Sequence, residues 1–141
     1  MNYSRRDLCL LLPALTAAAA TQNGSEEKLA GKVYAYGGLT AKPNGANVGR
    51  AVLKGETHSG YALEVHLTEL GPGSQPHPPH RHLHEEMLML RTGQLDVTMN
   101  GETKRISPGS VVFVASNILH GWKNPGPERA EYFVTELGSD T

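Results

Sequence analysis

The sequence has almost no cysteine, few aromatic residues and no long apolar run. Cys9 is the only cysteine, so no disulfide can form within the chain. One tryptophan, five tyrosines and two phenylalanines give little aromatic mass for a core, whereas 16 glycines and 9 prolines provide many turns. This composition is typical of a turn-rich β protein and disfavours a helical bundle.

An excess of charge of either sign is also missing. Thirteen Lys and Arg residues face fourteen Asp and Glu residues, which leaves a formal net charge of −1. A nucleic-acid-binding chain normally presents a basic face, so we expect neither nucleic acid nor an acidic membrane surface as a partner. A length of 141 residues supports one domain.

Residues 1–21 are interpreted as an export signal that is removed from the mature protein. The segment Ser4-Arg5-Arg6-Asp7-Leu8 resembles the twin-arginine motif, and an apolar run over residues 8–15 and an alanine tract follow it. That run is too short to span a bilayer. We therefore expect an exported, periplasmic protein with no membrane association after cleavage, and a mature chain without cysteine. Residues 22–30 are polar and predicted to be a disordered mature terminus.

Beyond residue 30 the pattern changes to short apolar or alternating segments between turn residues. These predict strands at 33–36, 48–53, 61–70, 86–90, 94–99, 103–106, 111–114, 119–123 and 130–137, with a turn over 41–47 and no helix. Asn100-Gly101 between two alternating segments predicts a two-residue hairpin turn with positive φ at both positions. About nine short strands at this spacing indicate a closed or double-sheet β barrel.

Two strands carry side-chain patterns that predict their environment. Along 61–70, Leu63, Val65 and Leu67 alternate with polar residues, so we interpret His66 as part of the polar face of a half-exposed strand and not as a ligand. The segment at 86–90 is apolar on both faces and 111–114 is continuously apolar, so both are predicted to be buried.

The stretch 76–93, PHPPHRHLHEEMLMLRTG, holds the strongest functional signal. Residues two apart on an extended strand point to the same side, so His80, His82 and Glu86 would project into one space. Imidazoles with a carboxylate suit a divalent transition metal such as iron, manganese, nickel, copper or zinc, and not magnesium or calcium. His120, the only histidine after this stretch, is the candidate for a fourth ligand.

The spacing of these residues is similar to the two motifs of the cupin family. His80, His82, Glu86 and Gly93 fall on the first motif, and Gly109, Ala115, Asn117, His120 and Asn124 fall on the second, with Ala115 and Asn117 in place of the family's proline and glycine. Asparagine tolerates positive φ, so a tight turn at Asn117 is expected. The resemblance covers roughly residues 60 to 136. Because it includes a second motif, a His-rich tract that binds metal adventitiously is a poor explanation of the histidine cluster.

The resemblance implies an all-β fold, the cupin jelly-roll or double-stranded β-helix barrel, as a single domain over residues 31–138. It also implies one divalent transition metal (Fe, Mn, Ni, Co, Cu or Zn) held by His80, His82, Glu86 and His120, and a homodimer. His77, in a proline-rich loop, is interpreted as an exposed residue or one behind the ligands. His84 is the alternative to one of the four named ligands.

Three histidines and one glutamate leave a divalent ion with one net positive charge and with positions for water, dioxygen or substrate. Cupins similar to flavonol dioxygenases use the glutamate also as a general base, a role that falls on Glu86. Trp122 shares parity with His120 and would line the pocket or pack in the core. The function that follows is a metal-dependent oxygenase or related oxidoreductase acting on a small phenolic or enolic substrate. The alternatives are an isomerase or decarboxylase using the same ion, and a non-enzymatic periplasmic module that binds a metal or small ligand.

Overall fold

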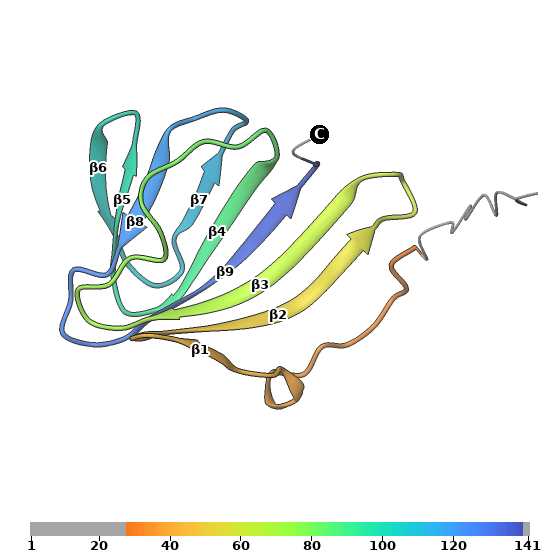
Figure 1. Cartoon of the computed structure of the whole chain (residues 1–141), viewed down its shortest axis with the longest axis horizontal. Helices are drawn as coiled ribbons and strands as arrows, with labels where there is room; N and C mark the ends of the chain where they lie inside the picture. The colour runs from red at the N-terminus through yellow and green to blue at the C-terminus, as the bar shows by residue number, and fades with distance from the viewer. Residues whose placement is uncertain (1–27, 140–141) are drawn as a thin grey trace, which may run out of the picture.

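Two antiparallel sheets make up the part of the chain, residues 28–139, that a computed structural model describes (Figure 1). The larger sheet has the order β1-β2-β3-β9-β4-β7 and the smaller one β6-β5-β8. The strands are β1 (Lys42–Asn44), β2 (Asn47–Glu56), β3 (Ala62–Leu70), β4 (Glu85–Thr92), β5 (Leu95–Met99), β6 (Glu102–Ile106), β7 (Val111–Val114), β8 (His120–Lys123) and β9 (Ala130–Leu137), and a 3-10 turn, η1 (Tyr36–Gly38), precedes them. Strands β1, β2 and β3 follow one another in the sequence, whereas the pairs β3–β9, β9–β4 and β4–β7 join strands that are not consecutive, as in a jelly-roll. The all-β, single-domain expectation is confirmed.

The core fills the space between the two sheets with aliphatic side chains and one aromatic pair. Leu88, Leu90 and Val134 come from the large sheet, whereas Leu95, Val97 and Trp122 come from the small one, and all are at most 5% exposed. Each strand contributes alternate residues, which is the period of two that the sequence shows. The two sheets are thus held together by apolar side chains from both of them.

Two turn predictions are confirmed by backbone angles. Asn100 and Gly101 have φ values of 48° and 90°, as the hairpin between β5 and β6 requires, and Asn117 has φ 64°. Asn117 N donates to His82 O over 2.8 Å, and Arg81 donates to Asn117 O over 2.5 Å. The turn at Asn117 therefore fixes the histidine-rich loop against the segment that leads into β8.

The predictions before residue 50 were partly wrong. Residues 33–36 form no strand, and the chain makes the turn η1 at Tyr36 instead, whose ring lies over the guanidinium groups of Arg50 and Arg91 at 5.3 Å each. The predicted turn over 41–47 contains strand β1. A tight bend at Gly45, with φ 58°, lets this short segment fold back onto β2.

The predictions that β4 is buried on both faces and that β7 is a buried strand were also partly wrong. Val112 and Val114 point into the barrel, but Val111 and Phe113 are 59% and 58% exposed, and Met89 is 38% exposed. β7 is the edge strand of the large sheet, and its outer face is uncovered. A continuous apolar run therefore predicted the strand but not the exposure of its outer face.

The predicted export signal, residues 1–21, lies outside the described residues, as does most of the predicted disordered terminus. At Leu29 the backbone N–H donates to Glu56 O over 2.8 Å, at the end of β2. Over residues 28–139 no helix has the length and the apolar character that crossing a membrane would require.

Candidate metal centre

Two backbone hydrogen bonds join the histidine-rich loop to strand β8. His80 N donates to His120 O, and His120 N donates to His80 O, each over 3.0 Å. Pro76, Pro78 and Pro79 precede this bridge, and their fixed φ angles and missing N–H groups keep the loop out of a helix. Residues forty positions apart are thereby placed side by side.

Close contact between the loop and β8 depends on Gly121. A Cβ at this buried position would lie 3.2 Å from Cα and Cγ of Pro79. Glycine is therefore the residue that lets the loop lie directly on the strand. Because His120 immediately precedes Gly121 and His80 immediately follows Pro79, this contact sets the separation of two of the predicted ligands.

Four of the predicted ligands converge at this point. The rings of His80, His82 and His120 form a triangle with centroids 4.7 to 5.3 Å apart, and their ring nitrogens can be chosen within 4.8 Å of one another. Glu86 Oε2 lies 2.8 Å from His82 Nε2 and 3.2 Å from His120 Nε2. Metal–ligand bonds of about 2.1 Å at right angles place neighbouring ligand atoms about 3 Å apart, so the spacing around Glu86 suits a common ion.

Backbone carbonyl groups orient two of the imidazole rings. His82 Nδ1 donates to His84 O over 2.7 Å, and His120 Nδ1 donates to Ile118 O over 2.9 Å. A carbonyl oxygen can only accept, so the proton of each neutral ring lies on Nδ1. Nε2 then carries the lone pair and faces Glu86, which is the arrangement found behind histidine ligands in metal sites.

Buried nitrogen atoms without hydrogen bonds show that these residues fit a metal ion. His80 Nδ1 and His120 Nε2 are inaccessible to solvent and have no hydrogen bond of acceptable geometry. Leaving such atoms unsatisfied costs free energy, and a bound cation would remove that cost. His120 and Glu86 are 1% and 5% exposed, so the centre lies inside the barrel. The donor set is compatible with a divalent transition metal. The assignment of these four residues as its ligands stays a prediction.

Mutual charge interactions set the protonation of the metal-free centre. Burial acts to raise the pKa of Glu86, but the hydrogen bonds to His120 and His82 outweigh it and hold that pKa below its usual value. Burial acts to lower the pKa of His120, but Glu86 and the Ile118 carbonyl raise it. The pKa of His80 is lowered by burial and by the neighbouring histidines. Metal binding must therefore compete with protonation of His120.

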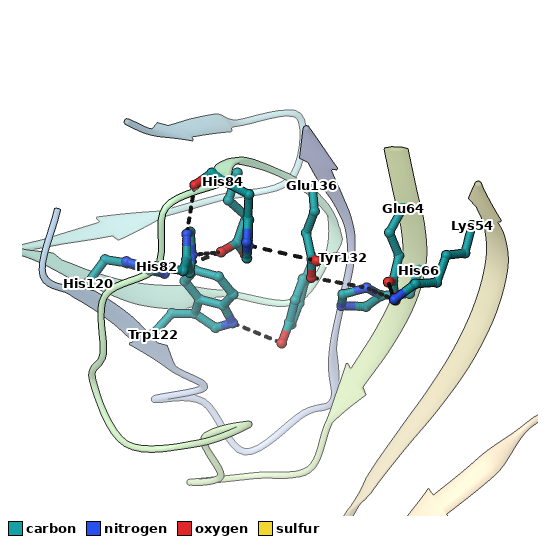
Figure 2. A network of polar contacts seen from close by, with 10 residues as sticks. Lys54, Glu64, His66, His82, His84, His120, Trp122, Tyr132 and Glu136 are labelled. Carbon is teal, nitrogen blue, oxygen red and sulfur yellow. Dashed lines mark hydrogen bonds and ion pairs between the residues drawn. The ribbon is translucent and has the colours of Figure 1, made fainter. Parts of the chain in front are cut away.

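A cavity of about 300 Å³ opens beside the predicted ligands. Its walls include His80, His82 and Glu86 on the metal side, and Trp122 and Tyr132 at the base. Trp122 Nε1 donates to Tyr132 Oη over 2.8 Å, and the Trp122 ring lies 5.7 Å from that of His120 (Figure 2). Trp122 was predicted either to line the pocket or to pack in the core. It does both, because it is 5% exposed and borders the cavity.

His77 and His84 flank the triangle of His80, His82 and His120. His84 also forms a group with His82 and Glu86 whose ligand atoms lie within 4.8 Å of one another, so it stays the alternative ligand. The ring of His77 lies 4.2 Å from that of His80, and its Nδ1 is 3.1 Å from the carbonyl of Pro78. The backbone bends at residues 83 and 84, so His84 stacks on His82 at 3.6 Å, with an interplanar angle of 7°, and faces Glu136 at 3.7 Å. Both histidines border the cavity.

Asn124, which closes the second motif, has a structural position. Its side chain is fully buried, and Nδ2 lies 2.7 to 3.2 Å from the carbonyl oxygens of Leu70, Gly71 and Glu128. Its Oδ1 accepts from Gly126 N over 2.9 Å. This residue ties the end of β8 to the end of β3, directly before the loop that carries the histidines.

The sequence interpretation missed residues on the wall opposite the ligands. Glu64, His66 and Thr68 were expected on a half-exposed polar face of β3, but that face is the inner wall of the barrel, where His66 and Thr68 border the cavity together with Glu136 of β9. The alternation itself was correct. It could not say that the polar face also lies inside, because Leu67 on the apolar face is fully buried while His66 and Thr68 on the polar face border the cavity.

Two curved antiparallel sheets that enclose three imidazoles, a carboxylate and a small cavity define a jelly-roll barrel with a candidate metal centre. A family model described as a Cupin domain matches residues 66–136, and the chain therefore belongs to the cupin family.

Solved structures share the fold at low sequence identity. The structure of KdgF from Halomonas sp. is 18% identical with a TM-score of 0.66, and the alignment covers 79% of this chain and 97% of that one. An RmlC-like cupin from Shewanella frigidimarina is 18% identical with a TM-score of 0.64, covering 77% and 93%. The polyketide cyclase RemF from Streptomyces resistomycificus is 15% identical with a TM-score of 0.64, covering 78% and 81%. At these identities the likeness shows the fold alone. No curated protein matches the sequence.

Proposed function

We propose that this protein is a metal-dependent oxygenase or related oxidoreductase that acts on a small phenolic or enolic compound. The observation that carries the proposal is the convergence of His80, His82 and Glu86 on one wall of a cavity of about 300 Å³, with His120 Nε2 3.2 Å from the Glu86 carboxylate. That volume lies at the lower end of the range for small-molecule sites. A substrate in the cavity would lie directly against the metal ligands.

Different residues of the chain are proposed to have different roles in the reaction. A bound divalent metal supplies Lewis-acid chemistry and, if it is redox-active, the chemistry by which dioxygen is activated. His82 and His120 are held by backbone carbonyls, so their Nε2 atoms are fixed before any ion arrives. Trp122 offers an apolar ring beside His120 for an aromatic or planar substrate. Glu86 is proposed as the residue that accepts the substrate proton, in addition to its role as a ligand.

Oxygen consumption tests the proposal. The protein, loaded in separate samples with Fe²⁺, Mn²⁺ or Ni²⁺, is given a panel of catechols, flavonols and enolisable diketones. We expect oxygen uptake with at least one pair of metal and substrate, retained by the exposed-histidine control His58→Gln and reduced at least about 100-fold in His120→Ala. Uptake that is equal in His120→Ala, or absent with every pair, would contradict an oxygenase.

A second candidate is a non-oxidative conversion, such as isomerisation, decarboxylation or cyclisation, with the same metal ligands. The likeness in fold to a protein named as a polyketide cyclase favours it. It predicts that product forms from a panel substrate under strictly anaerobic conditions and that His120→Ala abolishes it. Tight binding of a panel compound with no turnover under either condition would instead support the binding module.

We also propose that two copies pair through the outer face of β4 and β7. Met89 lies opposite Val111 in the register of these strands, and Phe113 follows on the same face, so exposed apolar side chains are contiguous there. Phe113→Asp is expected to convert a dimer to a monomer in light scattering, whereas Val33→Asp, at an 89% exposed position on another segment, leaves it a dimer. A monomeric wild-type protein would overturn this.

Export remains a proposal that rests on residues 1–21 alone. Replacing Arg5 and Arg6 by lysine together is expected to keep the protein in the cytoplasm of a host with a twin-arginine pathway. Unchanged export would contradict the assignment of that route.

A further inference from the structure

The inner wall opposite the predicted metal centre carries a second group of metal-binding side chains. Glu64 and His66 are two residues apart on β3 and point to the same face, and Glu136 of β9 is the direct cross-strand partner of Glu64. His66 Nδ1 lies 4.0 Å from Glu64 Oε1 and 4.0 Å from Glu136 Oε1 (Figure 2). All three ligand atoms lie within 4.8 Å of one another. We propose that these residues form a second divalent metal site.

Strand register makes this group a consequence of the fold. Direct cross-strand neighbours in an antiparallel pair have Cβ atoms about 5 Å apart. The same level of the large sheet continues from Glu136 to Glu86 of β4, so Glu64, Glu136 and Glu86 form a row of three carboxylates on the inner face. Like charges directly opposite each other destabilise a sheet, and a cation between them removes that cost.

Each carboxylate is held by its second oxygen. Lys54 Nζ contacts Glu64 Oε2 at 2.6 Å, and His84 Nε2 lies 3.7 Å from Glu136 Oε2. These contacts leave Oε1 of both glutamates directed at His66 Nδ1. Groups behind the ligands orient metal sites in this way. Lys54 offsets one of the two negative charges through its contact with Glu64 Oε2.

The distances suit a metal after a small adjustment. Ligand atoms at about 2.1 Å from an ion are about 3 to 4 Å apart, depending on the bond angle. Separations of 4.0 Å require movements below about 1 Å, and the three side chains are 28–29% exposed, so they have room to move. One imidazole and two carboxylates form a harder donor set than the three imidazoles of the first centre, and they suit manganese, iron, cobalt or zinc.

The two sites differ in the freedom of their ligands. The side chains of His82, Glu86 and His120 are at most 6% exposed and already held in place, whereas those of the second site must be immobilised on binding. Each long side chain that is ordered reduces affinity, so the second site is expected to bind at least about tenfold more weakly. Both sites border one cavity, through His66 and Glu136 on one wall and His82 and Glu86 on the other.

Titration of the tag-free, chelator-treated protein with Co²⁺ tests the proposal. Binding is counted by calorimetry and by visible absorption, and folding is monitored by near-UV circular dichroism. We expect two equivalents per chain of different affinity. Glu64→Gln keeps the shape of the side chain. Each of the two variants, Glu64→Gln and His66→Gln, is expected to lose the more weakly bound metal equivalent. The affinity for the more tightly bound equivalent should change by no more than about threefold. The control His58→Gln, in an exposed loop, keeps both equivalents.

The two centres can fail separately in this experiment. His120→Ala is expected to lose the tighter equivalent and to keep the weaker one, so the second site does not rest on the proposed function. Saturation of the wild type at one equivalent would overturn the second site. Survival of the second equivalent in both Glu64→Gln and His66→Gln would overturn it as well, because the ion would then be bound elsewhere.

Discussion

Replacing Asn124 by alanine should destabilise the fold without removing the metal-binding residues. Asn124 lies in the same motif as His120, but its side chain is fully buried and contacts only backbone groups. Its two amide N–H groups serve three carbonyl oxygens, and its oxygen accepts one N–H. This amounts to about three hydrogen bonds worth about 1 kcal/mol each, so the free energy of unfolding should fall by about 3 kcal/mol.

Urea unfolding measures this loss directly, and the melting temperature should fall by about 10 °C. Asn124→Asp is the sharper variant, because it turns the donor group into a second acceptor facing carbonyl oxygens, and it should cost at least as much as alanine. Asn44→Ala, at an exposed position in β1, is the matched control and should change stability by less than about 0.5 kcal/mol. Losses below about 1 kcal/mol in both Asn124 variants would refute the reasoning, as would loss of metal from a folded Asn124→Ala protein.

Three further predictions concern the first motif, the base of the cavity and pH. Gly93→Ala should lower the free energy of unfolding by more than about 2 kcal/mol in urea, because φ is 77° and a Cβ would lie 2.6 Å from backbone at the start of β9; a smaller loss would contradict the contact. Trp122→Phe and Tyr132→Phe should each lower the free energy of unfolding by about 1–2 kcal/mol, because the two side chains share a buried hydrogen bond. The double variant should show about 1 kcal/mol of coupling between them. Additive losses would contradict the shared hydrogen bond. Glu86 has a lowered pKa, so its contribution to stability is lost as pH falls below 4.5, its pKa in the unfolded chain. His120 has a raised pKa, so its contribution is lost as pH rises above 6.5, its pKa in the unfolded chain. The melting temperature of metal-free protein should therefore exceed that of Glu86→Gln most between pH 4.5 and 6.5, and a difference that grows from pH 6.5 to 8.5 would contradict the pairing.

The sequence allowed the strands with strong local signals to be predicted. β9 has the predicted bounds, 130–137, and the hairpin at Asn100-Gly101 has the predicted backbone angles. Both depend on short-range chemistry, namely alternation and tolerance of positive φ. The segment 33–36 has β-forming residues but no partner strand, so it forms none, and no local pattern reveals that.

The candidate site divides in the same way. The spacing of His80, His82, Glu86 and His120 predicted which side chains converge, because the motif spacing is a property of the sequence. The extended strand assumed for residues 80–86 was wrong, since the chain bends at residues 83 and 84 and β4 begins only at Glu85. The opposite wall was missed. The juxtaposition of His66 with Glu136 depends on the pairing of β3 with β9, which are sixty residues apart, and on the polar face of β3 turning inward. Long-range register of this kind is not encoded in any one segment.

The analysis of metal bound after extensive dialysis tests the central claim most directly. It compares tag-free wild-type protein with His80→Ala, His82→Ala, Glu86→Ala and His120→Ala, and dialysis removes ions held weakly elsewhere. One tightly held equivalent of a transition metal per wild-type chain, lost from each of the four variants while they stay folded, is the result that the account predicts. Metal retained by folded His120→Ala, or wild-type protein that binds no transition metal when one is supplied, would contradict it.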